Sequence, residues 1–282
     1  MFPLRVILKY AEAQLVSGPH PERARRDAEI LLCHALGHDR AWLLAHTNNG
    51  FEVEQGEFYD ALLARRTIGE PIQYIIGETE FYGLPFRVTP DVLIPRPETE
   101  HLVEKVLELA ANFPAPRIVD VGTGSGCIAI ALAHKLPQAY ITAIDLSKPA
   151  LAIARENARR NGVTVRFLEG DLLAPVTDEK FEFIVSNPPY VAEADRESLF
   201  VEVREYEPAL ALFAGDDVLA VNQRLIPAAF CALTPGGFVA LEIGFGQAAA
   251  ISELLATSGF EQIEYVPDLQ RIPRVACAQR PS

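Results

Sequence analysis

A glycine-rich turn is the first feature whose residue types and spacing suggest chemistry. It follows the strand-like segment RIVDVG and consists of Asp120, Gly122, Thr123, Gly124, Ser125 and Gly126, with one valine between the first two. Glycines at the junction of a strand and a helix let a ligand approach bare backbone. The turn lacks the Gly-Lys-Ser/Thr of a P-loop, and Cys127 stands where a dinucleotide fingerprint requires glycine. The spacing therefore predicts a nucleotide-like ligand outside these two classes.

Acidic residues end the next two strand-like segments. Asp145 closes YITAID, and Asp171 follows VRFLEG. In a doubly wound sheet, Asp145 would accept hydrogen bonds from both ribose hydroxyls of an adenosine above the glycine turn. Asp171 would accept from the adenine amino group, with Leu172 beside the ring. Simpler interpretations are a helix cap for Asp145, a turn acid for Asp171 and a glycine turn that serves only close packing.

Ser186-Asn187-Pro188-Pro189-Tyr190, at the end of the fourth strand-like segment, is the sharpest signal. Two prolines cannot continue a central β-ladder, and Pro188 restricts Asn187 to an extended conformation. The Asn187 side-chain oxygen and the Pro188 carbonyl can together accept both hydrogens of one planar NH2 group. Tyr190 adds a ring that can stack on that plane. The motif predicts a rigid rim for a flat amide or an aromatic amine.

The surrounding elements must bring these residues to one edge of a sheet. Strands and helices alternate from Arg117 onward, which predicts a doubly wound, Rossmann-like α/β domain with a parallel sheet. The last two strand-like segments, EQIEYVPD and RVACAQ, have no room between them for a crossover helix. We therefore expect an antiparallel strand pair at the C-terminus.

The part of the chain before this domain has a different pattern. Helical apolar spacing predicts a small helical bundle domain over residues 1–79. Between residues 80 and 96, β-forming residues are broken by glycine and prolines, which predicts a β-hairpin connector. The catalytic domain is expected over residues 97–282.

The composition narrows the class of protein. The 282 residues carry 25 basic and 38 acidic side chains, a net charge of −13, which disfavours stable binding to nucleic acid. The four cysteines are dispersed without CxxC spacing, so neither a zinc site nor a disulfide framework is expected. The N-terminus is amphipathic rather than signal-like, and Thr234-Pro235-Gly236-Gly237 breaks the longest apolar window. We expect a cytoplasmic protein without a membrane span.

The combined motifs resemble S-adenosylmethionine-dependent amino-methyltransferases, which include adenine-N6 and glutamine-N5 enzymes. Three further stretches resemble the HemK family of release-factor glutamine methyltransferases: RRDAEILL at 25–32, RRTIGEPIQYIIGETEFYGLPF at 65–86 and LIPRPETE at 93–100. The resemblance covers nearly the whole chain. It implies methylation of the glutamine in the Gly-Gly-Gln loop of class I peptide-chain release factors, in translation termination, with S-adenosyl-L-methionine as cofactor.

The resemblance also implies roles for individual residues. The glycine turn, Asp145 and Leu172 would line the cofactor, and Asn187 would touch cofactor and substrate. Pro188, Pro189 and Tyr190 would hold the glutamine. Leu172 replaces a bulky aromatic of some family members, and the Asp268 to Arg274 stretch has a spacer that differs from the family's, so we assign that stretch no role.

Methyl transfer to an amide mainly requires positioning. We expect Asn187 and Pro188 to hold the NH2 group in line with the methyl and to stabilise the charge that develops on nitrogen, without a metal. His101 and His134 are candidate bases by residue type only. Two alternatives stay open: an adenine-N6 DNA methyltransferase that holds a flipped base on the same rim, and a non-catalytic cofactor-binding module.

Overall fold

The computed structural model describes residues 2–282, and the chain forms two compact units. The helical unit extends up to Gly77 and includes a later segment, Leu199–Tyr206. The sheet unit consists of Glu78–Ser198 and Glu207–Ser282. The chain therefore leaves the sheet unit once, shortly after the Asn-Pro-Pro-Tyr motif, and returns eight residues later.

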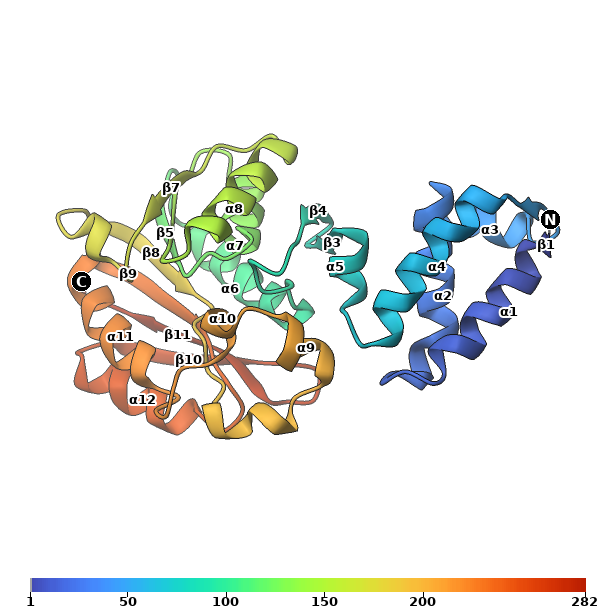
Figure 1. Ribbon diagram of the computed structural model, residues 1–282. Helices are drawn as coiled ribbons and strands as arrows, with labels where there is room; N and C mark the ends of the chain where they lie inside the picture. The colour runs from blue at the N-terminus through green and yellow to red at the C-terminus, as the bar shows by residue number, and fades with distance from the viewer. Residues whose placement is uncertain (1) are drawn as a thin grey trace. The chain divides into compact units, whose positions relative to one another are not determined.

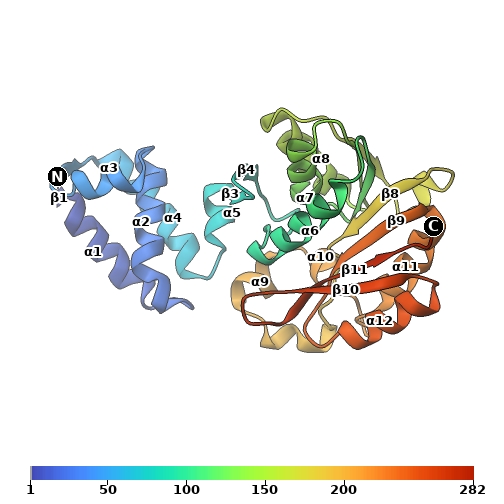
Figure 2. The same ribbon diagram turned by 180° about the vertical axis from the view of Figure 1, so that it is seen from behind.

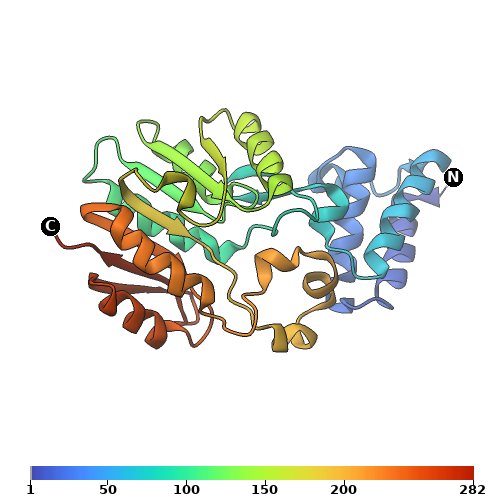
Figure 3. The same cartoon turned by 60° about the vertical axis from the view of Figure 1, so that its left-hand side comes forward.

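Amphipathic helices build the helical unit, whose first helices, α1 to α4, are drawn in shades of blue in Figure 3. Leu4, Leu8, Ala11 and Leu15 recur at helical spacing and are all buried, which packs the first helix against the second. The elements are β1 (Phe2–Pro3), α1 (Leu4–Leu15), a 3-10 turn (Pro21–Arg23), α2 (Ala24–Leu36), α3 (Arg40–Ala45), β2 (Gly50–Phe51), α4 (Val53–Thr67), α5 (Ile72–Ile76) and α9 (Val201–Tyr206).

A buried charged cluster holds α9 in the helical unit. Arg66 of α4 donates to Asp27 Oδ2 of α2 at 2.6 Å and to Glu202 Oε2 of α9 at 3.0 Å. His20 Nε2 lies 3.3 Å from the same Glu202 oxygen. Although burial opposes ionisation, Arg66 and the neighbouring cations hold the pKa of Glu202 below its ordinary value. Glu202 is thus an ionised anchor for the segment that follows the rim.

The sheet unit contains a seven-stranded sheet in the order β10-β11-β9-β8-β5-β6-β7 (Figure 1). Its strands are β5 (Arg117–Val121), β6 (Tyr140–Asp145), β7 (Arg166–Glu169), β8 (Phe181–Ser186), β9 (Leu233–Glu242), β10 (Glu261–Pro267) and β11 (Pro273–Gln279). Strands β5 to β9 pair in parallel, whereas β11 is antiparallel to both β9 and β10. The expected doubly wound fold with an antiparallel C-terminal pair is confirmed.

Helices cover both faces of this sheet (Figures 1 and 2). Alternate strand residues point to opposite faces, so Ile118 packs with α6 and α7 while Val119 packs with α11 and α12. The helices are α6 (Glu100–Ala110), α7 (Cys127–Lys135), α8 (Lys148–Arg160), α10 (Ala209–Leu212), α11 (Ala220–Ala232) and α12 (Ala248–Thr257). Short 3-10 turns cover Pro97–Thr99, Ala174–Val176 and Glu193–Ser198.

The hairpin expected over residues 80–96 consists of β3 (Glu78–Phe81) and β4 (Leu84–Arg87). Phe81 and Phe86 are buried in the same cluster as α6 and α7. The hairpin therefore packs as part of the sheet unit. The strand-free stretch from residue 88 to residue 96 leads from it to the 3-10 turn at Pro97–Thr99.

The strand order reverses between β5 and β8. From β5 the chain proceeds outward through β6 and β7, and it then returns to place β8 and β9 on the other side of β5. Such a switch point leaves a crevice at the carboxyl ends of the strands. The glycine turn follows β5 and Asn187 follows β8, so the sequence places both motifs at this crevice.

Among the helices of residues 2–282, none combines the length and the apolar character that crossing a membrane requires.

Candidate active site

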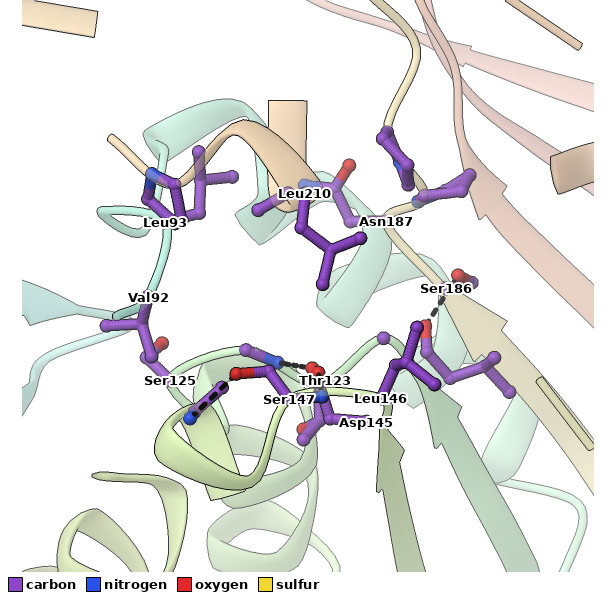
Figure 4. Close-up of a pocket in the computed structure, with 18 of the residues that line it drawn as sticks. Val92, Leu93, Thr123, Ser125, Asp145, Leu146, Ser147, Ser186, Asn187 and Leu210 are labelled. Carbon is purple, nitrogen blue, oxygen red and sulfur yellow. Dashed lines mark hydrogen bonds between the residues drawn. The ribbon is translucent and has the colours of Figure 1, made fainter. Parts of the chain in front are cut away.

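The carboxyl ends of the central strands open into a cavity of about 320 Å³ (Figure 4). Small-molecule sites have volumes of roughly 300–1,000 Å³. Asn187 and Leu210 lie on one side of the cavity, and Thr123 and Asp145 lie on the other. The residues expected from the sequence that line it are Gly122, Thr123, Gly124, Ser125, Asp145, Asp171, Leu172, Asn187, Pro188 and Pro189.

Glycine is required at the three glycine positions of the turn for two different structural reasons. Gly122 and Gly124 have φ of 75° and 54°, line the cavity, and have no heavy atom within 4 Å of the position that a Cβ would occupy. Gly126 does not line the cavity, and a Cβ there would lie 2.9 Å from Ile130 and 3.1 Å from Ala154. Glycine at this position lets α7 and α8 approach each other, and its expected contact with the cofactor remains a prediction.

Asp120 also lies away from the cavity. Its carboxylate is fully buried beneath the turn, where Oδ2 accepts from Thr123 Oγ1 at 2.6 Å and from the Ala129 backbone N–H at 3.3 Å. Burial raises the pKa of Asp120 to about 7, and the bond from Thr123 opposes that rise. Asp120 thus supports the turn, and its expected contact with the cofactor remains a prediction.

Asn157 of α8 is a second support that the sequence did not suggest. Its buried amide donates to the Ser125 carbonyl at 2.9 Å and to the Arg87 carbonyl at 3.0 Å, and it accepts from the Arg87 N–H at 2.7 Å. One side chain therefore fastens the turn to the β3-β4 hairpin. A lone asparagine in an amphipathic helix carries no visible signal of this role.

Asp145 combines a structural role with an exposed carboxylate edge. Its Oδ2 accepts from the Gly124 N–H and its Oδ1 from the Ser147 N–H, each at 2.8 Å. Burial raises the pKa of Asp145, whereas these backbone bonds favour the ionised form. A carboxylate has about four lone-pair sites, so two remain for ligand hydroxyls.

Asp171 is engaged by a partner that the sequence analysis did not consider. Arg224 of α11 donates to its Oδ2, and both side chains line the cavity. The neighbouring Leu172 has a φ of 50°, a left-handed conformation that is uncommon for leucine. The expected bond from adenine to Asp171 remains a prediction, and it would share the carboxylate with Arg224.

The proline rim is fastened to the end of β5 and to the turn before α6. Ser186 Oγ donates to the Val121 carbonyl at 2.6 Å, and Asn187 Nδ2 donates to Thr99 Oγ1 at 3.2 Å. Tyr190 does not line the cavity, because its ring packs near Gly244 and its hydroxyl lies 3.4 Å from Glu242 Oε1. Its expected stacking on the substrate remains a prediction.

Arg96 and Glu207 form another pair that the sequence analysis missed. Arg96 lines the cavity and donates to Glu207 Oε1, while Glu207 Oε2 accepts from the Ile94 N–H at 3.3 Å. The Glu207 side chain is buried. This pair joins the segment before α6 to the segment that re-enters the sheet unit before α10.

Comparison with known proteins decides the family. Residues 7–77 match the PrmC N-terminal domain, and residues 99–203 match the methyltransferase small domain. A release factor glutamine methyltransferase of Koribacter versatilis is 42% identical over 98% of this chain and 96% of its own length. One of Geobacter sulfurreducens is 44% identical over 90% of this chain and 89% of its own length. The chain belongs to the release factor glutamine methyltransferase family.

Solved structures agree with this methyltransferase fold. The ribosomal protein L11 methylase of Lactobacillus delbrueckii subsp. bulgaricus superposes with a TM-score of 0.51 at 27% identity. The similarity covers 70% of this chain and 86% of that one.

The cavity of this glutamine methyltransferase family member fits S-adenosyl-L-methionine on two observations. Gly122 and Gly124 leave open the space that Cβ atoms would fill, so a ligand can lie against bare backbone. Across the turn, Asp145 keeps acceptor sites for ribose hydroxyls. Both features suit the adenosyl part of the cofactor.

His101 and His134 do not join this site. Neither lines the cavity, and His101 lies 3.5 Å from Glu104 on the surface of α6. Their candidacy as bases rested on residue type alone.

Proposed function

We propose that this enzyme transfers a methyl group from S-adenosyl-L-methionine to the side-chain amide nitrogen, N5, of the glutamine in the Gly-Gly-Gln loop of class I peptide-chain release factors. The observation that carries the proposal is the position of Asn187 across the cavity from Thr123 of the glycine turn, with Pro188 and Pro189 also lining the cavity. Family membership favours glutamine over adenine as the methyl acceptor. Release factors act at ribosomes, so the proposed place of action is the cytoplasm.

The cofactor supplies an electrophilic sulfonium methyl group when bound. Gly122 to Ser125 and Asp145 would hold it, and Leu172 would flank the adenine. The remaining chemistry falls to the rim. An amide nitrogen is a weak nucleophile because its lone pair is delocalised, so the enzyme must position it and stabilise positive charge on it.

Asn187 and Pro188 can meet both requirements. The Asn187 Oδ1 and the Pro188 carbonyl would each accept one hydrogen of the glutamine NH2 group, which fixes its plane. The partial negative charges on these two oxygens favour the positive charge that develops on nitrogen. The methylated nitrogen then loses one proton to solvent, and neither His101 nor His134 lines the cavity to accept it.

Recognition of an intact release factor needs more surface than one glutamine offers. Stable protein recognition usually buries about 1,200 Å² or more in total. We assign this role to the helical part of the chain, expected over residues 1–79. A much lower KM for an intact factor than for a Gly-Gly-Gln peptide shows that contacts beyond the glutamine loop are used, and equal KM values contradict the need for them.

The proposed function is tested by methyl transfer to purified proteins. Labelled S-adenosyl-L-methionine is incubated with the enzyme and a class I release factor, and in parallel with the same factor whose Gly-Gly-Gln glutamine is replaced by alanine. We expect label in the first factor only. Equal labelling of both, or of neither, contradicts the proposal.

A further inference from the structure

A line of hydrogen bonds leads from the rim into the interior of the sheet unit. Asn187 Nδ2 donates to Thr99 Oγ1 at 3.2 Å, and Thr99 Oγ1 donates to Glu242 Oε2 at 2.6 Å. The Tyr190 hydroxyl donates to the other Glu242 oxygen at 3.4 Å. Thr99 and Glu242 are each only 2% exposed. Four residues from three separate parts of the chain thus form one relay.

The chemistry of these hydrogen bonds fixes which group donates and which accepts at each step of the relay. Thr99 Oγ1 donates its single hydroxyl hydrogen to Glu242 Oε2, so that hydrogen is not offered to Asn187. Burial raises the pKa of Glu242, and the bonds from Thr99 and Tyr190 oppose that rise. Thr99 can then offer Asn187 only a lone pair. Only the NH2 end of the Asn187 amide can face that lone pair, and its oxygen must face the other way.

The rest of the rim reinforces this polarity. Pro188 and Pro189 both line the cavity, and neither has a backbone N–H. One hydrogen of the Asn187 NH2 group is donated to Thr99, which turns Asn187 Oδ1 away from Thr99. The rim therefore offers oxygens to a ligand at Asn187 Oδ1 and at the proline carbonyls. Such a surface accepts an NH2 group and repels a carboxylate of nearly the same shape.

We propose that Thr99 and Glu242 are positioning residues that hold Asn187 as a hydrogen-bond acceptor and thereby set the selectivity of the site for a primary amide over a carboxylate. The inference rests on the proposed function, in which the NH2 group of glutamine is the methyl acceptor. Glu242 stands out in the sequence as an acid at the end of the otherwise apolar segment FVALE, and Thr99 belongs to LIPRPETE.

The first test replaces the Thr99 hydroxyl. Thr99→Val keeps the side-chain shape and removes the lone pair that faces Asn187, so kcat should fall by roughly 10- to 100-fold while cofactor affinity is unchanged. Thr99→Ser keeps the hydroxyl and should restore most of that loss. Thr257→Val removes a threonine hydroxyl on the exposed face of α12 and is the matched control with a wild-type rate.

The second test measures selectivity directly. The affinity for a release factor whose Gly-Gly-Gln glutamine is replaced by glutamate is divided by the affinity for the unchanged factor, so that all other contacts cancel. Thr99→Val should weaken the discrimination between the two factors by about tenfold, because Asn187 is then free to turn its NH2 group to the ligand. Glu242→Leu should act in the same direction, and the double variant should be little worse than either single variant.

The outcomes separate the inference from the proposed function. A wild-type enzyme that leaves the release factor unmethylated overturns the proposed function and the inference with it. An active wild type overturns the inference alone if Thr99→Val keeps both rate and discrimination, or if Thr99→Ser loses as much as Thr99→Val. Should the valine variant fail to bind cofactor, Thr99→Ala, which adds no atoms, is judged by the same two measurements.

Discussion

Asp145 at the end of β6 accepts a hydrogen bond from the backbone N–H of Gly124 at 2.8 Å. The acid expected to bind ribose thus also fixes the turn against which the ligand would lie. Its second oxygen accepts from the Ser147 N–H at the start of α8, also at 2.8 Å. One carboxylate therefore joins the first two βα connections of the sheet, and its loss should affect cofactor binding more than chemistry.

Replacement of Asp145 by alanine should raise the dissociation constant for S-adenosyl-L-methionine. A ribose contact is equally strong in ground and transition states, so it contributes uniform binding. Steady-state kinetics should therefore show recovery of the rate at saturating cofactor. A rate that stays low at every cofactor concentration would mean that Asp145 serves the chemical step.

Alanine at Gly124 and at Gly126 should have different consequences. Both positions have positive φ, so each substitution carries backbone strain of about 1 kcal/mol. At Gly126 the added Cβ also meets Ile130 and Ala154, so thermal unfolding should show the larger loss of stability there. At Gly124 the Cβ projects into open space beside the cavity, and titration should show the larger loss of cofactor affinity. Identical behaviour of the two variants would contradict this division.

Asp120 should make stability depend on pH. The pKa of Asp120 is raised from 3.8 to about 7, so the folded protein holds a proton that the unfolded chain releases. The contribution of Asp120 to the free energy of unfolding therefore falls as pH rises from about 4 to about 7 and is constant above that. Asn does not titrate, so Asp120→Asn should lack this fall. The free energy of unfolding of the variant minus that of wild type should therefore increase by about 3 kcal/mol from pH 5 to pH 8. Denaturant unfolding of both proteins at the two pH values checks this, and a constant difference contradicts it.

The Arg66 cluster should dominate the stability of the helical unit. Arg66 is nearly fully buried between Asp27 and Glu202, so Arg66→Leu leaves Asp27 without its cationic partner and leaves Glu202 with only Arg23 and His20. We expect a loss of about 3–5 kcal/mol in urea unfolding. Arg40 pairs with Glu29 but is 71% exposed, so Arg40→Leu is the matched control and should change stability by about 1 kcal/mol at most. Equal effects at the two arginines would contradict the role of burial.

The sheet could be predicted from the sequence because its central strands β5, β6 and β8 are short, mostly apolar runs, each followed by its own turn signal. The glycine turn, Asp145 and Asn187 were found for the same reason: each ends a strand, and parallel strands bring such ends together. The position of α9 could not be predicted, because its place in the helical unit depends on the contact between Glu202 and Arg66, which are far apart in the chain.

The residues that support the site could not be identified from the sequence either. Thr99, Asn157 and Glu242 act through partners on other elements, so their types alone reveal little. Asp120, Gly126 and Tyr190 were assigned to ligand contacts on their place in a motif. In the structure they contact the turn, α8 and Glu242, and their ligand contacts remain predictions. Sequence spacing identifies which residues reach an edge, but packing decides which of them face the cavity.

Tandem mass spectrometry of a methylated release factor tests directly whether Asn187 holds the glutamine amide for methyl transfer. The wild-type enzyme and Asn187→Ala are each incubated with saturating S-adenosyl-L-methionine and a class I release factor. With the wild-type enzyme we expect one added methyl group on N5 of the Gly-Gly-Gln glutamine. With Asn187→Ala we expect a rate lower by ~100-fold, which corresponds to a loss of about 3 kcal/mol of transition-state stabilisation, while cofactor affinity is largely retained. A methyl group on another residue, or a near-normal rate in the variant, would contradict this role of Asn187.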